Sequence, residues 1–245
     1  MRRITVVLSL IFFLNLIFCL NCSAQQSGNV VVDFNGVPQV VTYQAYVPLH
    51  NEADVLPVMV CVGGLPSGPD ECSDKPWIQF ADKNKIVVLG LGFTFVKEDW
   101  PRKSSYQFAQ AWSGQALLDV LDILEKIAPI DKNDLYLFGV SAGAQFSHRF
   151  ALMRPDMVKA VAAHAAGGYG HPEEFISTKF LITVGENDTK AGSGISRLQF
   201  ARIFAAACEE QGVGVDLRVI PGIAHRWIQE QNIMSRQFFL KVRRE

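Results

Sequence analysis

The chain has 245 residues, of which 49% are hydrophobic and 19% are charged. This length and composition predict one folded domain, or at most two small ones, and they exclude a disordered chain. The formal net charge of −1 leaves no excess of basic residues, so we do not expect a nucleic-acid partner.

The N-terminus has the pattern of a secretory signal peptide. Two arginines precede an apolar run at 4–20, and small residues at Cys22 and Ala24 suit signal peptidase. We expect cleavage after Ala24, which leaves a mature domain of residues 25–245, secreted or periplasmic and without stable membrane insertion. An uncleaved membrane anchor is one alternative. A lipoprotein modified at Cys22 is another, although the three residues before it form a poor lipobox.

Cys61, Cys72 and Cys208 remain after such a cleavage. Cys61 and Cys72 are close in the sequence, so they could form a disulfide in an oxidising compartment. We slightly favour the alternative in which Cys61 and Cys208 are buried and behave as small apolar residues. The spacing of the three cysteines does not match a zinc motif, and we expect neither a metal ion nor another cofactor.

Strand and helix patterns alternate along most of the mature chain. Two β-rich segments, 30–34 and 40–47, flank a turn-like stretch and predict an antiparallel pair. Short apolar runs predict buried strands at 57–62, 86–91, 135–138, 158–163, 180–184 and 215–220. Helical patterns cover 77–83, 105–128, 142–153, 196–211 and a last segment that ends near 242.

This alternation predicts an α/β fold, with a mainly parallel sheet and helices on both of its faces. The active site of such a sheet lies beyond the carboxyl ends of its strands. We therefore expect functional residues directly after each predicted buried strand.

The sequence Gly-Val-Ser-Ala-Gly at 139–143 stands between a predicted strand and a predicted helix. This GxSxG pattern predicts a tight turn that raises the Ser141 hydroxyl above the sheet and leaves the Ala142 amide free to bind an oxyanion. A second oxyanion donor is expected at Gly64 or Leu65, in the loop after an earlier strand. A glycine-rich turn with an idle serine is the alternative.

A serine nucleophile needs a base, and the chain has five histidines. Only His225 follows the last predicted strand and comes last in the order serine, acid, histidine. His164, which follows a central strand, is the main alternative. The acid is expected after the penultimate strand, where we favour Asp188 over Glu186. Asp216 begins the last strand at its amino end and is not expected to reach the site.

The sequence resembles secreted esterases related to polyhydroxybutyrate depolymerases and feruloyl esterases in four segments, at 139–143, 148–151, 154–156 and 161–168. The resemblance extends over roughly 57–227. It implies a single α/β-hydrolase catalytic domain that hydrolyses carboxylic esters through an acyl-enzyme, without a cofactor. It places the triad at Ser141, Asp188 and His225. One departure is that Val62, and not the histidine frequent in such enzymes, precedes the two glycines of the oxyanion loop.

Only residues 165–179 separate the strand after the serine helix from the strand before the acid. This segment is too short for the lid domain found in many lipases. We therefore expect a minimal, lidless domain whose open site suits a bulky or polymer-borne ester. Candidate substrate contacts near the strand ends are Phe93, Phe95, Trp100, His164, Tyr169, His171 and Trp227. Ordinary packing explains any single one of the aromatic residues equally well.

Two other functions fit the same pattern. A serine peptidase is one alternative, because the triad and the fold do not specify the leaving group. A catalytically silent relative, such as a carbohydrate-binding protein, is another. The complete set of Ser141, Asp188 and His225 argues against this second alternative.

Overall fold

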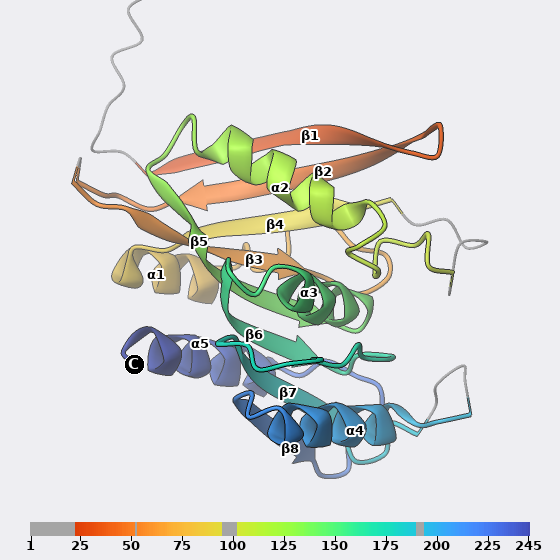
Figure 1. Ribbon diagram of the computed structural model, residues 1–245. Coiled ribbons are helices and arrows are strands. Elements are labelled where there is room, and N and C mark those ends of the chain that lie inside the picture. The colour runs from red at the N-terminus through yellow and green to blue at the C-terminus, as the bar shows by residue number, and fades with distance from the viewer. Residues whose placement is uncertain (1–22, 52, 95–101, 190–193) are drawn as a thin grey trace, which may run out of the picture.

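The computed structural model describes residues 23–51, 53–94, 102–189 and 194–245 (Figure 1). Most of the predicted signal peptide lies outside these residues, as do Phe95 and Trp100. In the described part of the chain, we find no helix with the length and apolar character needed to span a bilayer. Ala24, after which cleavage is predicted, is the first residue of the first strand.

Eight strands of the described chain form one sheet in the order β1-β2-β4-β3-β5-β6-β7-β8. The pairs β1·β2 and β2·β4 are antiparallel, and every other neighbouring pair is parallel. The strands are β1 (Ala24–Phe34), β2 (Val37–Val47), β3 (Leu56–Val62), β4 (Val87–Phe93), β5 (Ile130–Val140), β6 (Val158–His164), β7 (Lys179–Gly185) and β8 (Val215–Ile220). The predicted antiparallel pair and mainly parallel sheet are therefore confirmed.

Helices cover both faces of this sheet, as predicted (Figure 1). The helices are α1 (Lys75–Asn84), α2 (Ser113–Leu124), α3 (Ala142–Met153), α4 (Arg197–Glu210) and α5 (Gln229–Arg243). On one face, α2, α3 and α4 bury a large apolar cluster that includes Phe146 and Phe204. On the other face, α1 and α5 bury a smaller cluster around Trp77 and Phe239. Burial of these two layers holds the strand ends in fixed positions.

The predicted helix at 105–128 is too long, because α2 begins only at Ser113. Side-chain hydrogen bonds to the backbone explain the difference. The Trp112 indole donates to the Ser104 carbonyl at 2.7 Å, and the Ser113 hydroxyl donates to the Tyr106 carbonyl at 2.6 Å. These bonds stabilise a series of turns in place of the helical ladder. The apolar pattern still predicted burial correctly, since Ala109 and Trp112 lie in the core.

Candidate active site

Ser141 stands at the turn between β5 and α3, at the carboxyl edge of the sheet. Its backbone has φ = 53° and ψ = −110°, a region that a residue with a side chain rarely adopts. The Ser141 amide donates to the His164 carbonyl at 2.8 Å, so the turn is tied to the end of β6. Strain of this kind is the expected feature of a serine presented above a sheet.

Two glycines make this turn possible. A Cβ atom at Gly139 would lie 2.5 Å from the Gly143 carbonyl oxygen, and a Cβ atom at Gly143 would lie 2.0 Å from the Val62 carbonyl oxygen. Both distances are too short for a side chain. The glycines of the motif therefore allow the start of α3 to contact the end of β3, where the predicted oxyanion loop begins.

Ser141, His225 and Asp188 come together in one hydrogen-bonded chain. The Ser141 Oγ atom lies 3.1 Å from His225 Nε2, and His225 Nδ1 lies 2.9 Å from an Asp188 carboxylate oxygen. The Asp188 side chain is 1% exposed, whereas that of His225 is 37% exposed. The geometry therefore allows the histidine to take a proton from the serine while the buried carboxylate orients its ring.

Arg197, which the sequence analysis did not single out, contacts the same carboxylate. Its guanidinium lies 3.1 Å from the second oxygen of Asp188, and this arginine side chain is 21% exposed. Arg197 is the first residue of α4, which begins with a capping box formed by Ser196 and Gln199. A cation in the first turn opposes the helix dipole. An arginine at this unfavourable position could have indicated, from the sequence, that it has an anionic partner.

The alternative acids lie elsewhere. The Glu186 carboxylate accepts the Gly222 amide at 2.9 Å, so it holds the turn after β8. Asp216 pairs with Arg218 at 2.7 Å on the surface of β8. In the described structure, neither carboxylate has a hydrogen bond with the His225 ring.

His164 is the clearest departure from the expected site residues. It is fully buried, and its two ring nitrogens lie 2.7 Å from the Thr183 hydroxyl and 2.8 Å from the Ser235 hydroxyl. Burial lowers the pKa of His164 to about 3, so its ring is neutral at physiological pH. His164 therefore belongs to a buried polar network. Its ring is not placed to contact substrate or to act as the base.

Of the expected substrate contacts, Phe93 and Tyr169 stack on other aromatic rings, whereas Trp227 and His171 are exposed. Phe93 is buried and stacks on Tyr106 with ring centroids 4.7 Å apart, so it belongs to the core. Tyr169 stacks on Phe204 at 4.8 Å, and burial raises its pKa above the usual range. Trp227 is 42% exposed and lies two residues from His225. His171 is exposed and lies in the loop between β6 and β7.

The predicted oxyanion donors lie around Ser141. Ala142 is the first residue of α3, a position at which the backbone amide has no acceptor within its own helix. A Cβ atom at Gly64 would lie 3.5 Å from the Ser141 Cβ atom, so Gly64 faces the nucleophile directly. The buried Tyr106 hydroxyl donates to the Gly64 carbonyl at 3.4 Å and supports this loop. Leu65 is next in the chain and packs against the core.

Cys61, Cys72 and Cys208 are all buried and free, and no disulfide joins the first two. Burial raises the pKa of each thiol, which keeps all three protonated and unreactive. In the described ranges, no group of three or more histidine, cysteine, aspartate or glutamate residues could hold a metal ion.

No protein-family model and no curated protein sequence matches this chain. Its solved structural neighbours have the α/β-hydrolase fold, and the chain has this fold as well. A poly(3-hydroxybutyrate) depolymerase from Bordetella parapertussis is 23% identical over 91% of this chain and 94% of that chain, with a TM-score of 0.64. An S-formylglutathione hydrolase from Agrobacterium tumefaciens is 16% identical over 91% and 95%, with a TM-score of 0.65. A ferulic acid esterase from Anaeromyces mucronatus is 17% identical over 89% and 88%, with a TM-score of 0.63.

Proposed function

We propose that this chain is a serine esterase that hydrolyses carboxylic esters through an acyl-enzyme. The observation that carries the proposal is the hydrogen-bonded chain from Ser141 through His225 to Asp188. The strained backbone of Ser141 and the glycine-lined turn around it support the same conclusion. The fold shared with a poly(3-hydroxybutyrate) depolymerase and a ferulic acid esterase is consistent with this chemistry.

The proposed reaction proceeds in two stages. The Ser141 hydroxyl attacks the ester carbonyl while His225 accepts its proton, and the tetrahedral oxyanion binds the Ala142 amide and an amide of Gly64 or Leu65. His225 then donates the proton to the departing alkoxide, which leaves as the alcohol. A water molecule then attacks the acyl-enzyme while His225 accepts its proton. The bond between the acyl carbon and the Ser141 oxygen breaks, and His225 returns the proton to that oxygen as the carboxylic acid leaves.

We propose that the ester is bulky or borne on a polymer. The segment between β6 and β7 contains no helix or strand within the described chain, so it lacks the elements of a lid domain. Trp227 is 42% exposed and two residues from His225 in the sequence, so it is a candidate aromatic contact for such an ester. A panel of acetylated xylan, feruloyl esters and a short polyhydroxyalkanoate would identify the acyl group and the alcohol.

Replacing Ser141 by alanine tests the assignment. We expect ester hydrolysis to fall by several orders of magnitude, roughly 10³-fold or more, while the melting temperature stays close to that of the wild type. Covalent labelling by a fluorophosphonate probe should disappear in the same variant. Ser147→Ala is the matched control, because Ser147 lies on the same helix and its buried hydroxyl has no hydrogen-bond partner in the described structure.

Three results would contradict the proposal. Full activity of the Ser141→Ala protein would remove the serine from the mechanism, and failure of the wild type to react with the probe would favour a silent binding protein. Faster cleavage of peptide amides than of esters with the same acyl group would favour a peptidase. The panel therefore includes one such amide and ester pair.

We propose in addition that the protein is exported, with residues 1–24 as a cleaved signal peptide and residues 25–245 as the catalytic domain. The basic start, the apolar run and the small residues before position 25 support this. N-terminal sequencing of protein purified from outside the cytoplasm should begin at Gln25. An intact N-terminus or a lipid-modified Cys22 would contradict the proposed processing.

A further inference from the structure

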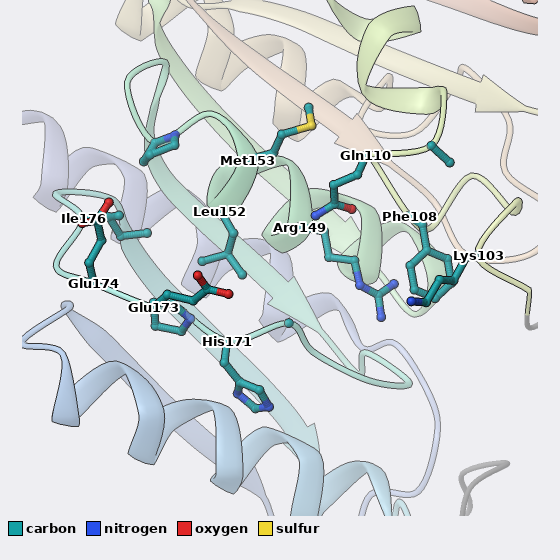
Figure 2. Close-up of a pocket in the computed structure, with 14 residues that line it drawn as sticks. Lys103, Phe108, Gln110, Arg149, Leu152, Met153, His171, Glu173, Glu174 and Ile176 are labelled. Carbon is teal, nitrogen blue, oxygen red and sulfur yellow. The ribbon is translucent and has the colours of Figure 1, made fainter. Parts of the chain in front are cut away.

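A cavity of about 780 Å³ lies beside the second half of α3 (Figure 2). Three parts of the chain line it, namely the turns before α2, the end of α3 and the loop between β6 and β7. None of Ser141, Asp188 and His225 lines this cavity. Its volume is in the range of pockets that bind small organic molecules. The cavity is therefore a separate candidate binding site.

Arg149 supplies a buried positive charge at this cavity. The residue is 9% exposed, one of its terminal nitrogens donates to the Gln107 carbonyl at 2.9 Å, and its guanidinium carbon lies 4.1 Å from the centre of the Phe108 ring. No described carboxylate lies within 4.0 Å of its nitrogens. Burial lowers the pKa of Arg149 to about 10, so it remains charged at neutral pH.

Arg149 is largely buried and has no counter-ion among the described residues, so a bound anion would stabilise its charge. Arg149 lines the cavity, and its second terminal nitrogen has no described hydrogen-bond acceptor. The planar guanidinium therefore retains donors for a ligand, and two parallel bonds to a carboxylate are the geometry it favours.

The two ends of the cavity differ in charge. Figure 2 shows the Arg149 guanidinium pointing toward Phe108 and Lys103 at one end, with Glu173 and Glu174 at the other. Leu152 lies between these ends, and the rest of the lining combines apolar residues such as Met153 and Ile176 with the polar residues Gln110 and His171 (Figure 2). A ligand with one negative group and an apolar body would match this arrangement. A second negative charge at the far end would be repelled by the glutamates.

We propose that this cavity binds a monocarboxylate with an apolar body, its carboxylate on Arg149 and Lys103 and its body against Leu152 and Ile176. Arg149 is eight residues past Ser141, which places it about 12 Å further along the helix at about 1.5 Å per residue. The proposed carboxylate site is therefore separate from Ser141. Ester hydrolysis releases carboxylic acids, so the proposed ligand belongs to the same chemical class as one of its products.

Calorimetric titration of the folded chain with 4-phenylbutyrate tests the proposal. We expect the wild-type and Ser141→Ala proteins to bind this acid equally, since the nucleophile does not line the cavity. Arg149→Met should weaken binding by about tenfold or more, because hydrogen bonds to a charged group are lost. Arg154→Met is the matched control, since Arg154 pairs with Asp156 at 2.7 Å and does not line the cavity; its affinity should equal that of the wild type.

Two further ligands separate the parts of the proposal. The neutral analogue 4-phenylbutan-1-ol should bind at least tenfold more weakly if the carboxylate is required, and inorganic phosphate should bind more weakly still if the apolar body is required. Equal binding of the alcohol, equal binding of phosphate, or unchanged affinity in Arg149→Met would each overturn the proposal.

If Arg149→Met does not fold, Lys103→Met provides a second test. Lys103 is exposed, so its replacement should leave folding intact. We expect a loss of affinity for 4-phenylbutyrate of about threefold, because an exposed charge contributes little. An unchanged affinity in this variant, measured at low salt, would contradict the placement of the carboxylate at this end of the cavity.

Discussion

His225 and His164 lie at the carboxyl ends of parallel strands, at the same edge of the sheet, but one is exposed and the other is buried. The His225 side chain is 37% exposed and lies 3.1 Å from the Ser141 hydroxyl. His164 is fully buried, and the hydroxyls of Thr183 and Ser235 contact its two ring nitrogens. The ring of His225 is within hydrogen-bonding distance of Ser141, whereas that of His164 is held in a closed polar network.

The difference arises from the position of each histidine relative to its strand and to α5. His225 lies in the open turn between β8 and α5, five residues after Ile220. His164 is the last residue of β6 itself, and α5 covers it through Ser235. A position at a strand end therefore brings a histidine to the carboxyl edge of the sheet. Whether its ring is exposed there depends on whether α5 covers it.

Replacing His225 by alanine should separate the two histidines most strongly. We expect ester hydrolysis to fall by about 10⁴-fold or more, because the serine loses its base, while the melting temperature changes little. Steady-state kinetics and thermal unfolding measure the two effects. His50→Ala is the control, since His50 lies between β2 and β3, at the amino end of β3. A loss of less than about 100-fold would show that another group serves as the base.

Replacing Arg197 by methionine should have the next largest effect. The Asp188 carboxylate would lose a donor at 3.1 Å in a site where it is 1% exposed. We expect kcat to fall about tenfold with little change in KM, together with a loss of about 3 kcal/mol in the free energy of unfolding. Arg197→Lys should restore part of the kcat.

Arg202→Met provides the control for this experiment, because Arg202 is exposed on the same helix. A purely structural role of Arg197 would lower stability but leave kcat unchanged for the folded protein. That result would exclude Arg197 as a positioning residue for Asp188 and would assign the contact to folding alone.

His164→Asn should affect stability more than catalysis. The buried hydrogen bonds to Thr183 and Ser235 would be broken or distorted, which we expect to cost about 1–3 kcal/mol of unfolding free energy. The kcat should fall by no more than about threefold, since the ring does not contact the nucleophile. Chemical denaturation and kinetics measure the two. A loss of activity as large as that of His225→Ala would contradict the division between the two histidines.

The same variant should change the dependence of stability on pH. The pKa of His164 is about 3 in the folded protein, against an ordinary value of 6.5, so the unfolded chain binds an extra proton between these pH values. This histidine therefore lowers stability as the pH falls from 6.5 toward 3, by at most about 1.4 kcal/mol per pH unit. The slope should be smaller in His164→Asn. Buried His148, whose pKa is also lowered, retains its own contribution in both proteins.

Local patterns predicted the fold and the candidate triad positions. Apolar runs and strand ends can be recognised from each segment by itself. The order of Ser141, Asp188 and His225 along the chain then selects the triad positions. The burial of His164 was not predictable in this way, because it depends on α5, whose Ser235 is distant in the sequence. The pairing of Arg197 with Asp188 joins the first turn of α4 to the loop after β7, so it could not be predicted from either segment alone. From the sequence, only the unfavourable position of Arg197 at the helix start was apparent.

The start of α2 was missed for a similar reason. The apolar repeat in 105–128 continues through residues that are buried but not helical. Periodicity alone does not distinguish a buried helix from a buried series of turns. Hydrogen bonds from Trp112 and Ser113 to earlier carbonyls decide the local backbone. One consequence is that Tyr106 lies in a turn from which its hydroxyl reaches the oxyanion loop.

Tyr106 is a buried residue whose hydroxyl reaches the loop at Gly64, so it joins the core to the candidate active site. Its ring is 1% exposed and stacks on Phe93, and its hydroxyl donates to the Gly64 carbonyl at 3.4 Å. Burial raises the pKa of this hydroxyl above its usual range, so it remains a donor. The Gly64 carbonyl and the Leu65 amide belong to one planar peptide group, and the hydrogen bond therefore orients that amide as well.

Tyr106→Phe should have a small effect on catalysis and almost none on stability, so its combined effect is the smallest of these variants. If the Leu65 amide binds the oxyanion, we expect kcat to fall about twofold to fivefold with KM and stability nearly unchanged, because a long hydrogen bond contributes little. If the Gly64 amide is the donor, it lies in the preceding peptide group and kcat should not change. Tyr46→Phe is the control, because its hydroxyl donates to Asp82, far from the nucleophile in the fold. The kcat ratio of these two variants therefore distinguishes Leu65 from Gly64 as the second oxyanion donor.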